Sequence, residues 1–290
     1  MSIHISVRWA GECKLLRDPT DSYGQRLIIT TLGDYGSLVH NPIPSSSLVR
    51  VMEEFDLSSG SCRSALSRLV RAGYLDRVTR GRTTAYQLSL HGESLVREGR
   101  ERIVKFGTPK VWDGRWSLVV FSVAENKRHV RHVVRTRLRE LGFAPFFDGT
   151  WIAANSDIEE VTRNLNEIEH AEIAIFDGEL KNSYISILEK ARKNWKLDNV
   201  SDRYIEFIDA FTPIFEKLKS NKILPEEAFV TRTRLMDEWR VFPRIDPELP
   251  DEIVPVDWPR PRARRLFDQL YEMLRPSAEV GFTQILDRES

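Results

Sequence analysis

The chain has 290 residues with 43 basic and 43 acidic side chains, so its formal net charge is zero. This length favours two or three domains, and the 41% hydrophobic content is enough to form buried cores. A uniformly basic composition is excluded, and no apolar run approaches the ~18 residues of a membrane span. Two cysteines, Cys13 and Cys62, make no disulfide framework, and the start of the chain lacks a signal-peptide core. We therefore expect a cytoplasmic protein.

The charge is unevenly distributed along the chain. Residues 1–110 carry 16 basic and 11 acidic side chains, a net charge of +5. Residues 111–180 have a net charge of −4, and residues 181–290 a net charge of −1. This asymmetry is typical of a regulator whose DNA-binding head lies at one end of the chain.

The first third of the chain predicts two helices ahead of a basic segment. Residues 1–21 show no periodicity, so we expect a flexible arm. Residues 23–32 have helical spacing, and Gly33-Asp34-Tyr35-Gly36 predicts the end of that helix. A serine among residues 45–47 can cap the next helix, whose inward residues are Leu48, Val51, Met52 and Phe55. This helix is expected to be the first of a helix-turn-helix pair.

Residues 58–73 predict the second helix of that pair. Ser58 or Ser59 can cap its start, and Gly73 is suited to its C-terminal end. Cys62, as a small buried hydrophobe, belongs to one apolar face with Ala65, Leu66, Leu69 and Val70. The opposite face is polar and carries Ser61, Arg63, Ser64, Ser67, Arg68 and Arg71.

A predicted β-hairpin follows, formed by residues 75–79 and 83–88 around Gly81. Residues 58–89 hold six arginines and one acid, a net charge of +5. Arginine binds phosphate and guanine edges bidentately, so a polar helix and a basic hairpin predict a winged helix-turn-helix. The alternative is a solvated surface with ordinary arginines. The expected DNA-binding residues are Ser59, Ser61, Arg63, Ser64, Ser67, Arg68, Arg71, Arg80 and Arg82.

After a helix over residues 91–104, the middle of the chain predicts a βαββαβ order, which is the ferredoxin-like arrangement. Strands are expected over residues 116–123, 143–147, 150–154 and 172–176. The first helix covers residues 127–141, with Val130, Val133, Val134, Leu138 and Leu141 inward. Ser156 and Glu159 resemble a capping box that opens the second helix.

The helix over residues 127–141 is strongly basic. Lys127, Arg131, Arg135 and Arg139 recur every four residues, with Arg128 and Arg137 beside them. Such a row can bind effector phosphates, extend a DNA footprint, or form an ordinary solvated face; the effector residues would be Arg128, Arg131 and Arg135. His129 and His132 lie one helical turn apart and could hold a metal, but a solvated helix is favoured.

The last third predicts a mainly helical region. Helices are expected over residues 184–195, 201–218, 225–239 and 262–274, the last ending at Pro276. Residues 242–261 are proline-rich and are expected to be extended, with Trp258 in the core. Excess apolar faces favour dimer contacts. No nucleophile motif, Cys/His pair or phosphate-binding glycine loop is present, so neither an enzyme nor a cofactor is expected.

The sequence resembles the phenylacetic acid degradation repressor (PaaX) family. The resemblance rests on residues 25–36, 63–75 and 80–88, and continues in residues 246–250 and 254–259. It implies an α+β protein with a winged helix-turn-helix (22–105), a Cas2-like ferredoxin-like domain (111–180) and a helical C-terminal domain (181–290). Arg260 stands where the family often has glycine.

The resemblance also implies a function. It implies a homodimeric repressor of an aromatic-acid catabolic operon that binds a double-stranded DNA operator, with no membrane association. Phenylacetyl-coenzyme A or a related coenzyme A thioester would release it, although another effector, or none, remains open. The Cas2-like domain also raises the alternative of a metal-dependent nuclease. Cas2 nucleases place an aspartate at the end of the first strand, whereas the first acid here is Glu125.

Overall fold

A computed structural model of the chain describes residues 23–39, 41–108, 111–154, 156–181, 189–190, 192–220 and 223–288. The side chains of Arg80 and Ser220 are outside this description, as are the expected arm over residues 1–21 and Cys13. The chain forms two compact units. The first unit comprises residues 1–105, 207–241 and 262–290; the second comprises residues 106–206 and 242–261.

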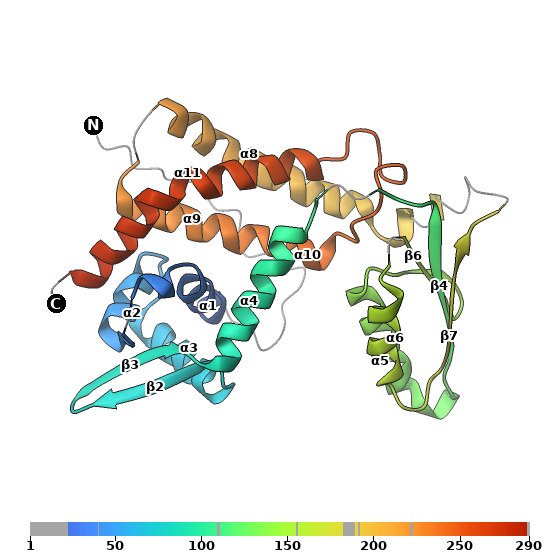
Figure 1. Ribbon diagram of the computed structural model, residues 1–290, viewed down its shortest axis with the longest axis horizontal. Coiled ribbons are helices and arrows are strands. Elements are labelled where there is room, and N and C mark those ends of the chain that lie inside the picture. Colours follow the sequence, from blue (N-terminus) through green and yellow to red (C-terminus); the bar gives the residue numbers. More distant parts are fainter. Residues whose placement is uncertain are drawn as a thin grey trace. The chain divides into compact units, whose positions relative to one another are not determined.

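The N-terminal part of the first unit contains the predicted helices and hairpin (Figure 1). Its elements are α1 (Tyr23–Tyr35), the 3-10 helix η1 (Gly36–Leu38), β1 (Ile43–Pro44), α2 (Ser45–Glu53), α3 (Ser59–Arg71), β2 (Leu75–Arg80), β3 (Thr83–Leu88) and α4 (Leu90–Lys105). The three strands form an antiparallel sheet in the order β1-β3-β2.

Two helix boundaries in this region differ from the prediction. Helix α1 continues through Gly33 and Asp34 to Tyr35, because Tyr35 is fully buried and holds the last turn in the core. At the start of α2, Pro44 occupies the N-cap position and no side chain caps the helix, so the predicted serine cap is wrong. The fixed φ of proline suits a helix entry, which makes a serine there dispensable.

The C-terminal part of the first unit is built from long helices. These are the second half of α8 (Leu197–Ser220), α9 (Pro225–Trp239) and most of α11 (Arg260–Asp287). Pro276 was predicted to end the last helix, but α11 runs through it. An interior proline costs ~3 kcal/mol. Burial of Ala278, Phe282 and Ile285 beyond it outweighs that cost, at about 1.5–3 kcal/mol for each large side chain.

The second unit confirms the predicted βαββαβ order. Its elements are β4 (Arg115–Ser122), the 3-10 helix η2 (Glu125–Lys127), α5 (Arg128–Glu140), β5 (Ala144–Phe147), β6 (Thr150–Ala154), α6 (Ile158–Asn166) and β7 (Glu172–Glu179). All pairings are antiparallel in the order β5-β6-β4-β7, which is the ferredoxin-like order. Figure 1 shows α5 and α6 over the same face of this sheet. Their apolar residues share a core with Val119, Phe121 and Trp151.

Details of this unit correct three expectations. Asp157, not Ser156, caps α6 by accepting hydrogen bonds from the backbone N–H groups of Glu159 and Glu160, both at 3.0 Å. A carboxylate one residue nearer the helix can reach both donors. Val133 is 45% exposed, so it does not belong to the core face of α5. The proline-rich stretch begins with the short helix α10 (Phe242–Ile245) instead of being extended throughout.

The proline-rich stretch is held by a buried polar cluster within the second unit. The hydroxyl of Tyr204 donates to Asp246 at 2.6 Å, and a guanidinium nitrogen of Arg260 lies 3.3 Å from the same carboxylate. Burial raises the pKa of Asp246, and Arg260 opposes that rise. Trp258 is buried, as predicted. Arg260, where the resemblance favours glycine, therefore compensates a buried carboxylate.

Candidate nucleic-acid interface

The candidate interface begins with α3, whose ends are defined by local sequence. Ser58 is its N-cap: the side-chain oxygen accepts a hydrogen bond from the Ser61 backbone N–H at 3.3 Å. Gly73 ends the segment with φ +78°, a conformation that glycine adopts without strain. Cys62, Leu66 and Leu69 are buried at 0–2% exposure, so one face of α3 is held in the core.

The opposite face of α3 is open to solvent. Ser59 is half-buried, whereas the other predicted residues of this helix are exposed: Ser61, Arg63, Ser64, Ser67, Arg68 and Arg71. Within the part of the chain that the structure describes, the guanidinium groups of Arg63, Arg68 and Arg71 form no ion pair. The positive charge of this face is thus available to an external anion.

The β2–β3 hairpin lies beside α3 (Figure 1). It adds further exposed arginines. The strands pair in continuous register from Leu75 opposite Leu88 to Arg80 opposite Thr83. The connection is the dipeptide Gly81-Arg82, and Gly81 has φ +60°. Arg77 and Arg82 are exposed. The Arg80 backbone lies at the hairpin tip, but its side chain is outside the described part of the chain.

A compact joint ties the hairpin to the end of α3. The Ser89 hydroxyl donates to the Gly73 carbonyl at 2.6 Å and accepts from the Gly92 N–H at 3.0 Å. A Cβ on Gly92 would lie 2.1 Å from the Tyr74 carbonyl oxygen, so only glycine fits there. The sequence analysis did not predict these contacts, although the Ser-x-x-Gly spacing of Ser89 and Gly92 at the start of α4 could have indicated them.

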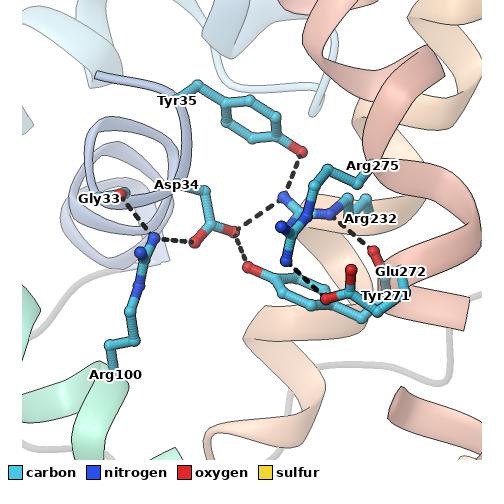
Figure 2. Close-up of polar contacts among 8 residues, drawn as sticks. All are labelled: Gly33, Asp34, Tyr35, Arg100, Arg232, Tyr271, Glu272 and Arg275. Atoms are coloured by element: carbon cyan, nitrogen blue, oxygen red, sulfur yellow. Dashed lines mark hydrogen bonds and ion pairs between the residues drawn. The ribbon is translucent and has the colours of Figure 1, made fainter. Parts of the chain in front are cut away.

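The N-terminal part of the first unit, from α1 to α4, is called the head below. It is anchored to the C-terminal helices by a buried polar network centred on Asp34, drawn in Figure 2. The Tyr271 hydroxyl donates to the Asp34 carboxylate at 2.8 Å, and the Arg232 guanidinium lies 3.4 Å from it. Arg232 also donates to the Tyr35 hydroxyl at 3.2 Å, and Arg100 lies 3.8 Å from Asp34. The network joins α1, α4, α9 and α11. Since α1 packs on both α3 and α9, the network also supports α3 through α1.

The electrostatics of this network follow from its burial. The side chains of Asp34 and Arg232 are 9% and 5% exposed. Desolvation raises the pKa of Asp34, while the guanidinium of Arg232 and the hydrogen bond from Tyr271 oppose that rise. A buried charge of this kind is tolerated only where a partner and hydrogen bonds compensate it. Arg232 is therefore the residue that makes Asp34 compatible with this core.

Further arginines from the C-terminal helices pair with acids of the head. Arg234 lies 3.5 Å from Asp56, and Arg288 lies 2.8 Å from Glu54. In the reverse direction, Arg26 of α1 pairs with Asp237 at 3.2 Å. Arg234 and Arg288 thus neutralise head carboxylates, whereas in the third pair a head arginine neutralises a carboxylate of α9. The exposed arginines of α3 and the hairpin keep their charge, so the positive potential concentrates on that face.

Cys62 takes no part in chemistry at this face. It is fully buried, and burial raises the pKa of its thiol to about 11. A thiol in this environment stays protonated at neutral pH and packs as a small apolar side chain. This confirms the role predicted for it from the apolar face of the helix.

The residues expected to contact an effector lie elsewhere, on α5 of the second unit. Arg128, Arg131 and Arg135 are all exposed, and Arg131 donates to the Val123 carbonyl at 3.0 Å. His129 and His132 are exposed on the same helix. Among the described residues, no group of three or more His, Cys, Asp or Glu side chains is placed to hold a metal ion. No described helix is long and apolar enough to span a membrane.

A capped helix with a free arginine face, beside a hairpin with exposed arginines, is typical of proteins that bind the major groove of double-stranded DNA. Three family models match successive parts of the chain. They are described as PaaX-like protein (residues 24–92), PaaX protein central Cas2-like domain (109–187) and PaaX-like protein C-terminal domain (195–284). The chain belongs to the PaaX family.

The chain is also similar to individual proteins. The chain is 28% identical over 260 residues to the Transcriptional repressor PaaX of Escherichia coli K12, covering 88% of this chain and 81% of that protein. Among solved structures, it is similar to the uncharacterized protein Rv0674 from Mycobacterium tuberculosis, with a TM-score of 0.55 and 17% identity. That match covers 89% of this chain and 99% of the other, and it shows a shared fold.

Proposed function

We propose that this protein is a DNA-binding transcriptional repressor whose head is a winged helix-turn-helix. The observation that carries the proposal is the α3 face, where Arg63, Arg68 and Arg71 are exposed and, among the described residues, unpaired. The element order of the head and the name of the Escherichia coli relative support it. A metal-dependent nuclease is less well supported, since the relative is named as a repressor and the first acid after β4 is Glu125.

The proposal assigns different tasks to the exposed residues. Arg63, Ser64, Ser67 and Arg68 would contact base edges in the major groove, where arginine reads guanine bidentately. Arg82 and Arg80 would hold the hairpin on the phosphate backbone. Ser59, Ser61 and Arg71 lie toward the ends of α3 and would contact flanking phosphates, which position the helix without reading sequence.

We further propose a homodimer that reads a pseudo-palindromic operator of an aromatic-acid catabolic operon. A coenzyme A thioester, such as phenylacetyl-coenzyme A, would release it. The support for both is membership of the PaaX family. A coupling free energy of ~1–3 kcal/mol between effector and operator would shift DNA affinity by about 5–150-fold. Thermal-shift measurements with a series of coenzyme A thioesters test the effector, and sedimentation of the protein with and without operator tests the dimer.

A mobility-shift titration tests DNA binding directly. The probe is a duplex from the promoter of the protein's own gene, and the competitor is an unrelated duplex of the same length. We expect a discrete complex near physiological salt that survives an excess of competitor. A complex that competitor DNA removes at equal concentration would contradict specific recognition, and magnesium-dependent loss of the probe would favour the nuclease.

A further inference from the structure

Helix α5 carries a concentration of positive charge that the head does not explain. Residues 127–139 hold six of the eight lysines and arginines of residues 111–180, and no acid. Glu140, the last residue of α5, pairs with Arg137 at 3.3 Å. The other acids of that segment lie outside α5; β7 alone carries Glu172, Asp177 and Glu179 and no base. An ordinary solvated helix mixes both signs to favour intrahelical pairs. On α5 the single acid follows the basic residues and pairs with Arg137 alone, so the other five basic side chains have no acidic partner within the helix and offer a surface for an anion.

The geometry of α5 turns this charge into a stripe. Val130, Val134 and Leu138 are buried at 6% or less, so the helix is held firmly on the sheet. At about 100° per residue, Arg128, Arg135 and Arg139 lie within ~40° of one another around the helix axis. They span roughly 16 Å along it, at about 1.5 Å per residue. We call this stripe, with the flanking residues Arg131 and His132, the α5 ridge.

Internal contacts hold part of the ridge and leave part of it open. Arg139 lies over the Trp151 ring at 5.3 Å from its centroid, and Arg131 is bonded to the Val123 carbonyl at 3.0 Å. Arg128 and Arg135 are exposed and, within the described part of the chain, make no hydrogen bond or ion pair. Arg131 and Arg139 are thus fixed by internal contacts, whereas Arg128 and Arg135 are free to bind phosphate.

Building on the proposed function, we propose that the α5 ridge binds the phosphate backbone of double-stranded DNA, as a second contact separate from α3. A duplex presents one phosphate per ~3.4 Å of axis on each strand, so a stripe of this length matches several phosphates. A small phosphorylated ligand such as coenzyme A is instead bound in a concave site that buries ~70–90% of its surface. The exposure of Arg128 and Arg135 fits a backbone lying on the helix better than an enclosed ligand.

The test compares two charge-matched double variants of the full chain. Arg128→Gln/Arg135→Gln removes the open pair of the ridge. Arg163→Gln/Lys181→Gln removes two exposed charges of the same unit outside α5. The measured quantity is the dependence of the DNA association constant on salt, for a promoter duplex and for a random duplex of equal length. Coenzyme A is titrated against each protein in parallel.

For the ridge variant, we expect the slope of log association constant against log salt concentration to become shallower on both duplexes, by ~0.9 for each phosphate that is no longer neutralised. We expect the control variant to keep the wild-type slope. Equal slopes for the ridge variant and the wild type would overturn the proposal, as would equal flattening by both variants. Loss of coenzyme A binding with an unchanged DNA slope would also overturn it. If the wild type binds no duplex, the proposed function is contradicted as well. If Arg63→Ala/Arg68→Ala abolishes binding and the ridge variant does not change it, only the proposal for the ridge is contradicted.

Discussion

Arg232 on α9 reaches Asp34 on α1, 198 residues earlier in the chain, and brings its guanidinium to 3.4 Å from the carboxylate inside the first unit (Figure 2). Arg232 also lies 3.6 Å from the Tyr271 ring centroid on α11. Helix α3, which packs on α1, therefore rests on a scaffold whose parts come from both ends of the sequence. We expect the head to depend on the C-terminal helices for its stability.

Arg232→Met tests this dependence. The variant leaves the Asp34 carboxylate buried without its main counter-charge, and breaking a buried pair costs ~3–5 kcal/mol of unfolding free energy. Lys219→Met is the control, because its pair with Glu216 is exposed and exposed pairs contribute about 0.2–1 kcal/mol. Urea unfolding followed by far-ultraviolet circular dichroism measures both. Similar decreases in stability for the two variants would show that the network does not support the head.

Arg260→Met should destabilise the second unit in a pH-dependent way. Burial raises the pKa of Asp246, and removal of Arg260 raises it further. Above the pKa that Asp246 has in the variant, the variant shows its full loss of unfolding free energy. This loss decreases as pH falls toward the wild-type pKa of Asp246, because a protonated Asp246 needs no cation. Unfolding midpoints measured from pH 7.5 downward should converge for the two proteins. A difference that stays constant or grows with acid would contradict this assignment.

Two helical glycines should respond in opposite ways to alanine. A Cβ on Gly281 of α11 would lie 2.0 Å from the Pro225 carbonyl oxygen, so α9 and α11 would have to separate. At Gly99 of α4 a Cβ meets nothing within 4 Å. Helix propensity favours alanine by ~1 kcal/mol at either site. We expect Gly99→Ala to raise the thermal midpoint and Gly281→Ala to lower it, because the clash outweighs propensity. A stabilising Gly281→Ala would show that these helices do not approach closely.

Cys62 should report on the opening of α3. In a Cys13→Ser background, a thiol reagent should label the native protein at least ~100-fold more slowly than the urea-unfolded protein, because a pKa of about 11 and full burial disfavour the thiolate. Labelling of the native protein at the unfolded rate would mean that the apolar face of α3 is accessible.

Local sequence predicts much of the interface. Ser58, Gly73 and the apolar spacing of α3 are short-range signals, and the structure has the helix and hairpin where they place them. The βαββαβ order follows from strand and helix periodicity in the same way. In each case the residues that define an element lie within that element or directly beside its ends.

Long-range contacts account for what sequence reasoning missed. The pairing of Asp34 with Arg232 has no local signal, and it accompanies the extension of α1 past Gly33. Pro276 predicts a helix end by its own chemistry, but burial of Phe282 beyond it keeps α11 continuous. The partition of the C-terminal segments between two units depends on the same tertiary packing.

The proposed repressor function depends on recognition of DNA by the free arginines of α3. The direct measurement compares the affinity of wild type, Arg63→Ala/Arg68→Ala and the α4 control Arg97→Ala for the promoter duplex and for a random duplex, at fixed salt. We predict that the α3 variant loses ~1–3 kcal/mol per base-contacting arginine on the promoter and less on random DNA, so that the specificity ratio falls. A specificity ratio equal to that of wild type and control would contradict the assignment of α3 as the recognition helix.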